Sequence, residues 1–223
     1  MKKLMIITFL IALVSTSIAQ NWDEPTYIEG EKYKGFIILN DGDTLYGLLK
    51  AQYPSDLNTQ NHVTIMVSNQ TSCIFYDEKE KTSKRYKAKE LKGYMIAERY
   101  YTSLDYNDNL MAKSKTFALL LKQGGISEYV YYSSKPDLLH KKTSNESYTD
   151  YYNKIYSKKT VYHRDGVKPI DNQSIALGFK KKMSAFVEDN QKLASKIANK
   201  EKGYKMFNLQ KIINEYNDWH LTK

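Results

Sequence analysis

The chain has 223 residues, a formal net charge of +9 and one cysteine. This length is sufficient for a hydrophobic core, and one domain is the first expectation. A single cysteine excludes an intramolecular disulfide, so packing and hydrogen bonds have to stabilise the fold.

The first nineteen residues have the pattern of a secretory signal peptide. Two lysines supply positive charge, the apolar run 4–14 follows, and Ser17 and Ala19 place small side chains at the −3 and −1 positions of a cleavage site. An apolar run this short does not make a comfortable membrane span. We therefore predict cleavage between Ala19 and Gln20, and export of the mature chain 20–223 to the periplasm, the cell surface or the medium.

Export changes which partners the positive charge indicates. The mature chain keeps 32 basic and 25 acidic residues, a net charge of +7. In a cytosolic protein this excess would favour nucleic acid. Outside the cytoplasm we expect no nucleic acid, and an anionic envelope glycan, a lipid head group or a protein becomes the expected partner. A solvated lysine-rich surface without a specific partner is the simpler alternative.

Turn residues between alternating apolar runs predict three β-hairpins. The first joins strands 33–39 and 44–49 through Asp41-Gly42, which supplies the positive φ of a tight turn. The second joins 116–122 to 126–132, and the third joins 160–163 to 167–170. Further strands are expected at 62–67, 72–76, 84–87 and 93–98, with an exposed turn at 77–81 and a long loop at 134–158 that contains a helical turn at 148–155.

From about residue 173 the apolar period changes from two to about 3.6, which predicts helices. One stripe contains Ile175, Phe179, Met183, Phe186 and Val187. Asp189 or Asn190 is placed to cap a second helix, and Asn208 to cap a third. The third helix would bury Leu209, Ile212, Ile213, Tyr216 and Trp219.

These patterns predict the α+β class. An antiparallel β-rich part, residues 20–172, would form hairpins arranged as a sandwich or a partly open barrel. Two or three helices in residues 173–223 would pack on it, because helices with single apolar stripes are not stable alone. Both parts would belong to one domain. No later run of about twenty apolar residues occurs, so we expect no transmembrane segment in the mature chain.

The chain contains no P-loop, dinucleotide fingerprint, zinc-protease helix or nucleophile elbow. The run 105–109 begins like a calcium loop, but Leu110 and Thr116 stand where Gly and Glu are needed. Asp41 and Asp43 are expected to build a turn rather than an acid–base pair. Cys73, in an apolar strand, is expected to be a buried thiol. The four histidines lack metal-ligand spacing: His62, His140, His163 and His220.

We therefore predict no catalytic residue, no metal site and no cofactor, and the sequence identifies no binding residues. The twenty tyrosines cluster at 100–101, 129–132 and 148–156. One interpretation is a glycan- or peptide-binding face, because tyrosine combines a flat apolar ring with a hydroxyl. The other is compositional bias.

The opening of the mature chain resembles a known family. The run 33–38, YKGFII, and the run 42–48, GDTLYGL, are similar to the "GYI … GDTxxGxI" opening of secreted Bacteroidota proteins of unknown function. The stretches 86–94 and 190–219, the latter in the helical C-terminus, are similar as well. Phe36 stands where this family usually has Tyr. The resemblance implies an exported envelope location and brings no catalytic residue.

Thr44 is a candidate modification site. Asp43-Thr44-Leu45 resembles the O-glycosylation sequon of secreted Bacteroidota proteins. A triplet of this type occurs by chance roughly once in every one or two chains of this size. The hairpin edge would nevertheless make Thr44 accessible to a modifying enzyme.

These features predict an exported cell-envelope protein that acts as a non-enzymatic binding or interaction module. Two alternatives stay open: a hydrolase with a site assembled from distant carboxylates and tyrosines, and an accessory protein that docks on the outer membrane through a basic face. Convergent carboxylates in a deep pocket would favour the hydrolase. A flat exposed tyrosine patch would favour binding, and a one-sided lysine face would favour docking.

The first testable prediction concerns processing. Because small residues occupy the −3 and −1 positions, exported protein should begin at Gln20. Intact-mass measurement of the exported protein determines the N-terminus directly. A retained N-terminus would contradict the predicted location.

Overall fold

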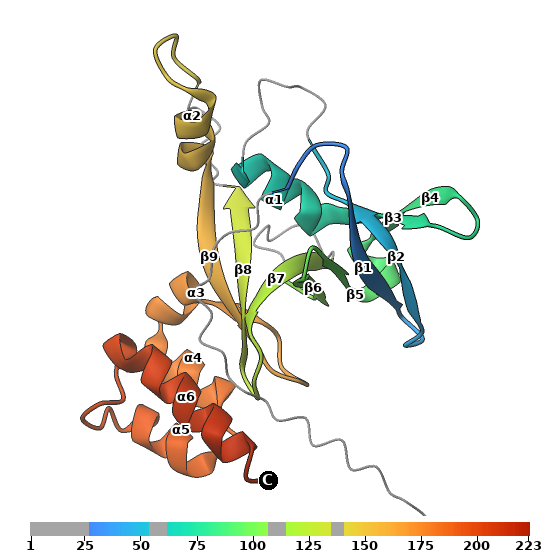
Figure 1. Ribbon diagram of the computed structural model, residues 1–223. Coiled ribbons are helices and arrows are strands. Elements are labelled where there is room, and N and C mark those ends of the chain that lie inside the picture. Colours follow the sequence, from blue (N-terminus) through green and yellow to red (C-terminus); the bar gives the residue numbers. More distant parts are fainter. Residues whose placement is uncertain (1–26, 54–61, 107–114, 135–140) are drawn as a thin grey trace, which may run out of the picture.

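The computed structural model describes residues 27–53, 62–106, 115–134 and 141–223. These residues form an antiparallel ten-stranded sheet, with one helix against its inner face and a helical cluster at one end (Figure 1). The predicted α+β class is therefore confirmed. The predicted signal peptide and cleavage site lie outside the described residues. So does residue 107 onward of the run 105–109, which begins like a calcium loop but lacks the residues that such a loop needs.

The strands make two meanders joined by one pairing. The first meander runs from β1 to β4 and the second from β5 to β10, and β5 pairs with β1. The order is therefore β10-β9-β8-β7-β6-β5-β1-β2-β3-β4, an open curved layer rather than a sandwich. The strands are β1 (Lys32–Leu39), β2 (Thr44–Lys50), β3 (Ser72–Asp77), β4 (Thr82–Lys87), β5 (Leu91–Ile96), β6 (Arg99–Leu104), β7 (Thr116–Lys122), β8 (Ser127–Ser134), β9 (Tyr156–His163) and β10 (Ile170–Asp171).

The three predicted hairpins are present as β1–β2, β7–β8 and β9–β10. In the first turn, Gly42 has a φ of 107° and the Asp43 amide donates to the Asp41 carboxylate at 3.0 Å. These aspartates therefore build the turn, as expected. The last hairpin is shorter than predicted because β10 contains two residues. The predicted helical turn is α2 (Tyr148–Ile155), in which the Ser147 hydroxyl accepts from the Asp150 amide.

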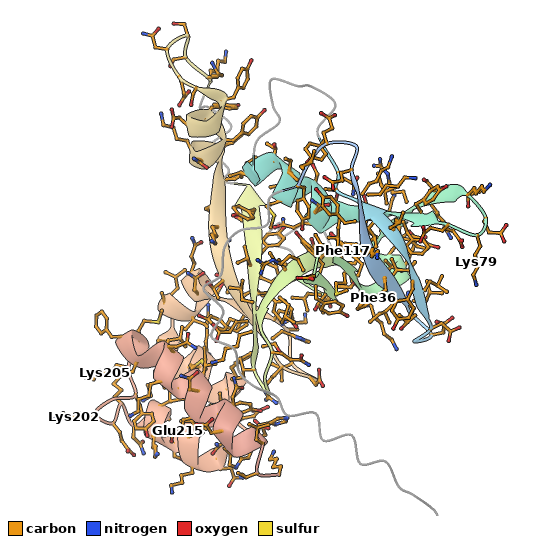
Figure 2. The ribbon with its side chains drawn as sticks, in the orientation of Figure 1. Phe36, Lys79, Phe117, Lys202, Lys205 and Glu215 are labelled. Atoms are coloured by element: carbon orange, nitrogen blue, oxygen red, sulfur yellow. The ribbon has the colours of Figure 1, made fainter. Side chains whose placement is uncertain are left out.

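The strand predicted at 62–67 is wrong. These residues begin helix α1 (His62–Thr71), which contacts β3 at one end of the sheet and β7 and β8 towards the other. The sheet therefore curves around α1. A strand inside this curve would leave backbone groups buried without partners, whereas a helix satisfies them internally. Phe117, labelled in Figure 2, is buried in the core around α1. Cys73 is buried in the same core, which confirms the buried thiol, and burial raises the pKa of Cys73 to about 12.

Strand β6 has no counterpart in the sequence prediction. It pairs with β5 through a two-residue turn, Ala97-Glu98, whose φ values are 48° and 62°. Such turns usually contain Asn or Gly, because other side chains are strained at positive φ. The usual sequence signal for a hairpin was therefore missing.

The C-terminal cluster contains helices α3 (Asn172–Ala176), α4 (Phe179–Phe186), α5 (Gln191–Ala198) and α6 (Leu209–His220). The single first helix predicted from its apolar stripe is wrong, because the chain breaks at Leu177-Gly178 and makes α3 and α4 instead. Asn190 caps α5 as predicted, with its side chain accepting from the Leu193 amide at 3.1 Å. Asn208 precedes α6 but makes no side-chain cap hydrogen bond. It is the last residue of a short 3-10 helix, η3 (Met206–Asn208); another, η2 (Ala88–Glu90), precedes β5.

The helical cluster meets the sheet at the β7–β8 and β9–β10 hairpins, and not across its inner face (Figure 1). Ile126 and Tyr162 from the sheet share a core with α4, α5 and α6. At this junction the side chain of Asn217 accepts from the Ile126 amide at 2.6 Å and donates to the Ile126 carbonyl at 3.1 Å. Asn217 is 9% exposed. Helix α6 is thereby hydrogen-bonded to the backbone beside β8.

The second prediction concerns this junction. Asn217→Ala removes both hydrogen bonds and leaves two buried backbone groups of Ile126 unsatisfied, so we expect the free energy of unfolding to fall by about 2 kcal/mol or more. Asn214→Ala on the same helix removes an exposed contact with Lys122, and should cost at most about 0.5 kcal/mol. Urea denaturation of both variants measures the difference. Equal losses would contradict the proposed importance of Asn217.

Candidate functional site

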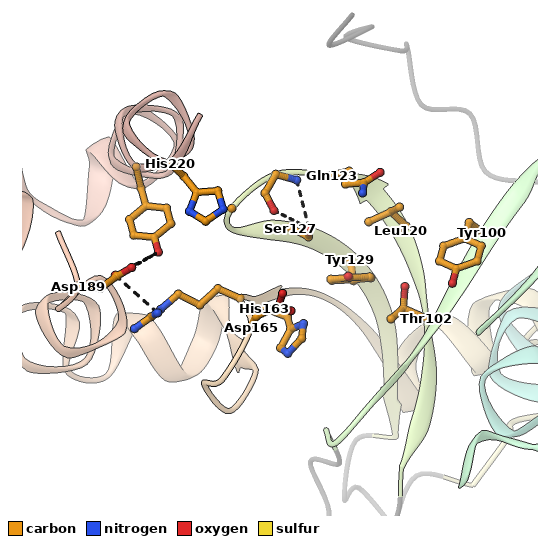
Figure 3. A pocket seen from close by; sticks show the side chains of 14 residues that line it. Tyr100, Thr102, Leu120, Gln123, Ser127, Tyr129, His163, Asp165, Asp189 and His220 are labelled. Carbon is orange, nitrogen blue, oxygen red and sulfur yellow. Dashed lines mark hydrogen bonds and ion pairs between the residues drawn. The ribbon is translucent and has the colours of Figure 1, made fainter. Parts of the chain in front are cut away.

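A cleft of about 370 Å³ lies where the helical cluster meets the outer face of the sheet (Figure 3). Strands β6, β7 and β8 form one wall, and Asp189 and α6 form the opposite wall. The β7–β8 and β9–β10 turns lie between them. Elements far apart in the sequence therefore build this site.

The sheet wall contains two aromatic rings. Tyr100 and Thr102 on β6, Leu120 on β7 and Tyr129 on β8 alternate with residues that face the inner core. Leu120 and Tyr129 are direct cross-strand partners. Two of the tyrosine clusters seen in the sequence, at 100–101 and 129–132, thus each contribute one ring to the same wall.

The aromatic surface continues outside the cleft. Tyr46 on β2, Phe36 on β1, Met95 on β5 and Tyr100 on β6 are successive cross-strand partners, so their side chains share the outer face. The ring centroid of Phe36 lies 5.7 Å from that of Tyr46 and 6.2 Å from that of Tyr100. Tyr46 is 79% exposed. We call these four residues the aromatic row; it ends at Tyr100 in the cleft.

Gly93 gives the row its shape at the cleft entrance. A Cβ atom at this position would lie 2.5 Å from the Tyr100 hydroxyl and 2.6 Å from the Tyr101 carbonyl. The ring of Tyr100 therefore lies close over the backbone of β5, which only glycine permits.

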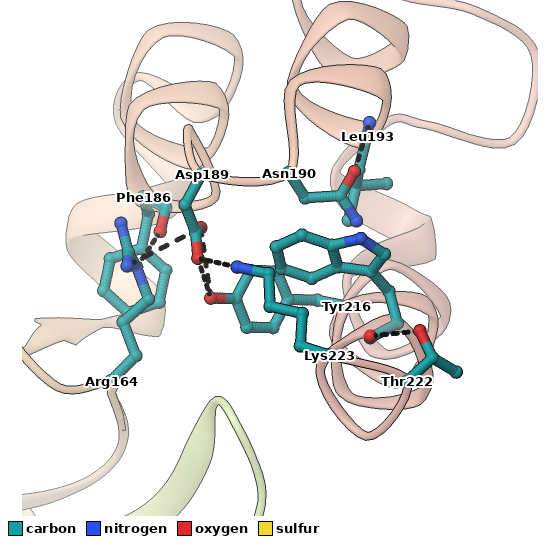
Figure 4. Close-up of polar contacts among 9 residues, drawn as sticks. Arg164, Phe186, Asp189, Asn190, Leu193, Tyr216, Thr222 and Lys223 are labelled. Carbon is teal, nitrogen blue, oxygen red and sulfur yellow. Dashed lines mark hydrogen bonds and ion pairs between the residues drawn. The ribbon is translucent and has the colours of Figure 1, made fainter.

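The helix wall carries a hydrogen-bonded charge network centred on Asp189 (Figure 4). Tyr216 donates to the Asp189 carboxylate at 2.9 Å, Arg164 lies 3.6 Å away and Lys223 3.4 Å away. Arg164 also donates to the Phe186 carbonyl at 2.6 Å. Burial would raise the pKa of Asp189, but the Tyr216 hydrogen bond and the two cations outweigh it and lower that pKa. Burial and the same hydrogen bond raise the pKa of Tyr216 to about 12.

Two histidines that lie far apart in the sequence both line the cleft. His163 ends β9, and His220 ends α6, where its ring stacks on Tyr216. Burial lowers the pKa of His163, and the charge of Asp165 opposes this shift. The imidazole of His163 is therefore neutral at neutral pH and offers one donor and one acceptor.

The cleft floor at the β7–β8 turn depends on two glycines. A Cβ atom on Gly124 would lie 2.5 Å from the Asn217 side chain, and one on Gly125 would lie 2.5 Å from the His220 ring. The Ser127 hydroxyl closes this turn by donating to the Gly124 carbonyl at 3.1 Å. The turn therefore approaches α6 closely.

The other sequence candidates lie elsewhere. Thr44 is exposed at the start of β2, and Asp41 and Asp43 lie in the β1–β2 turn. Among the described residues, no group of three or more His, Cys, Asp or Glu side chains is arranged to hold a metal ion. None of the helices in the described part of the chain is long and apolar enough to cross a membrane.

Comparisons with known proteins identify no relative. No protein-family model matches the chain, and no curated protein or solved structure does. The resemblance to secreted Bacteroidota proteins therefore stays a prediction, and the site has to be interpreted from its own chemistry.

The third prediction concerns His163. The pKa of His163 is lowered from 6.5 in the folded protein. As the pH falls through this range, the unfolded chain therefore binds more protons than the folded chain, and the free energy of unfolding decreases. NMR titration of the ring should give a midpoint below 6.5. Asp165→Asn should lower that midpoint further, because it removes the opposing charge. A midpoint at or above 6.5 would show that the ring is not desolvated.

Proposed function

We propose that this protein is an exported, non-enzymatic carbohydrate-binding module of the cell envelope. The observation that carries the proposal is the aromatic row, which crosses four strands on the outer face and opens into a polar cleft. Sugar rings present apolar C–H faces and outward hydroxyl groups. Aromatic rings beside hydrogen-bonding side chains are complementary to both.

The cleft supplies the polar part of such a site. Hydroxyls of Thr102 and Ser127, the amide of Gln123 and the neutral imidazole of His163 line it. Asp165 is exposed at the β9–β10 turn and adds an acceptor for sugar hydroxyls. These groups donate and accept hydrogen bonds, whereas the row provides apolar contact area.

An extended peptide fits this surface less well. Peptides that bind sheets usually add a strand to a free edge. The row lies on strands whose neighbours on both sides are already paired, β1 and β5 being central in the order. Recognition there has to use side chains, which favours a ligand recognised through its faces and hydroxyls.

The hydrolase alternative needs two carboxylates that act on one bond. Asp189 and Asp165 both line the cleft. Asp189, however, already binds Tyr216, Arg164 and Lys223. We therefore place binding ahead of hydrolysis.

The fourth prediction tests the row. Affinity electrophoresis in gels that contain soluble xylan, mannan, β-glucan or solubilised peptidoglycan should show retardation by at least one polymer. Tyr46→Ala should weaken that binding about five-fold or more, because one exposed ring is lost. Its exposure means that the fold should be preserved, which circular dichroism checks.

Phe207→Ala is the matched control, because Phe207 is exposed but lies on the helical cluster. It should leave retardation unchanged. No retardation by any polymer, or equal effects of the two substitutions, would contradict carbohydrate binding through the row.

A further inference from the structure

A basic loop with an exposed aromatic ring lies between α5 and α6. The segment 200–207, here called the basic tip, contains Lys200, Lys202 and Lys205 with one acidic residue, Glu201. Phe207 is 99% exposed, although its neighbour Met206 packs on the helical core. Figure 2 shows Lys202 and Lys205 at the end of the cluster, directed away from the sheet.

The tip is held in place by specific contacts. Lys196 donates to the Glu215 carboxylate at 2.8 Å and to the Tyr204 hydroxyl at 2.7 Å, and Tyr204 donates to Glu215 at 2.9 Å. Lys200 lies two residues after the end of α5 and has a φ of 56°. The Glu201 amide donates to the Lys196 carbonyl at 3.1 Å. The exposure of Phe207 therefore belongs to an ordered loop, and not to a segment without contacts.

The helical part of the chain carries an excess of positive charge. Residues 173–223 contain ten lysines and five acidic residues. Lys211 lies beside the tip, with its ammonium group 4.6 Å from the ring centroid of Tyr204. Glu215, the nearest acidic residue of α6, is already paired with Lys196. Lys200, Lys202 and Lys205 form no ion pair within the described residues.

We infer that the basic tip docks on an anionic lipid surface, with Phe207 entering the interfacial region and the lysines contacting the head groups. One exposed ring gives too little apolar area for a stable protein interface. A ring flanked by lysines is instead suited to the boundary between head groups and acyl chains. The basic tip shares no residue with the aromatic row. Lipid binding would also account for the excess of lysine in residues 173–223, which carbohydrate binding through the row does not explain.

Vesicle co-sedimentation tests the inference. All variants are expressed from the full-length coding sequence, so that they share one N-terminus. The protein should bind mixed vesicles that contain phosphatidylglycerol and phosphatidylcholine in a 1:1 ratio. It should bind vesicles of pure phosphatidylcholine much more weakly, and binding to the mixed vesicles should decrease as the salt concentration rises. Each lysine contributes about a five-fold change in partitioning, so Lys202→Ala/Lys205→Ala should bind about 25-fold more weakly.

Phe207→Ala should weaken binding to the anionic vesicles about ten-fold or more. Tyr46→Ala removes another exposed ring, which lies on β2 and not on the basic tip, and should leave vesicle binding unchanged. In Phe207→Trp, the emission should shift to shorter wavelength on adding anionic vesicles. Absence of binding to anionic vesicles, equal binding to phosphatidylcholine, or binding that the Phe207 and lysine substitutions do not change would each overturn the inference.

Discussion

Two buried carboxamides bind the backbone near the two ends of β8. This strand adds side chains to the core around α1, and it follows directly on Ile126, which belongs to the core of the helical cluster. At one end Asn217 pairs with the amide and carbonyl of Ile126. At the other end Gln70 of α1 accepts from the Tyr132 amide at 2.6 Å and donates to its carbonyl at 3.0 Å. Each carboxamide accepts a hydrogen bond from a backbone amide and donates one to the carbonyl of the same residue, as a neighbouring strand would do. Because these groups are buried, a broken pair leaves unsatisfied polar atoms, which gives both contacts high energetic weight.

The candidate site is a consequence of strand register. Tyr101 faces the inner core, where it stacks on Tyr94 at 4.7 Å, so Tyr100 has to face outward into the cleft. A slip of one residue would exchange the two rings. The Ala97-Glu98 turn sets this register through two residues at positive φ. The backbone conformation of this turn thus helps to determine which tyrosine faces the cleft.

The molecule has two chemically different surfaces. The aromatic row and cleft combine rings with neutral hydrogen-bonding groups and one internally paired charge network. The basic tip combines lysines with Phe207. The two surfaces belong to different elements, so a substitution in one leaves the contacts of the other intact. An envelope protein that uses both would hold a carbohydrate polymer close to a lipid surface.

The α+β class, three hairpins, the buried Cys73 and the Asn190 cap could be predicted from local sequence patterns, because alternation, turn residues and capping groups act over a few neighbouring residues. The helix at 62–67 could not, because it depends on the curved sheet that encloses it. The tertiary structure also decided where the site lies. Tyr100, Tyr129, His163 and His220 come from separate elements, and no local pattern records that pairing and helix packing bring them together. Their chemistry was visible in the chain, but their common location depends on long-range contacts.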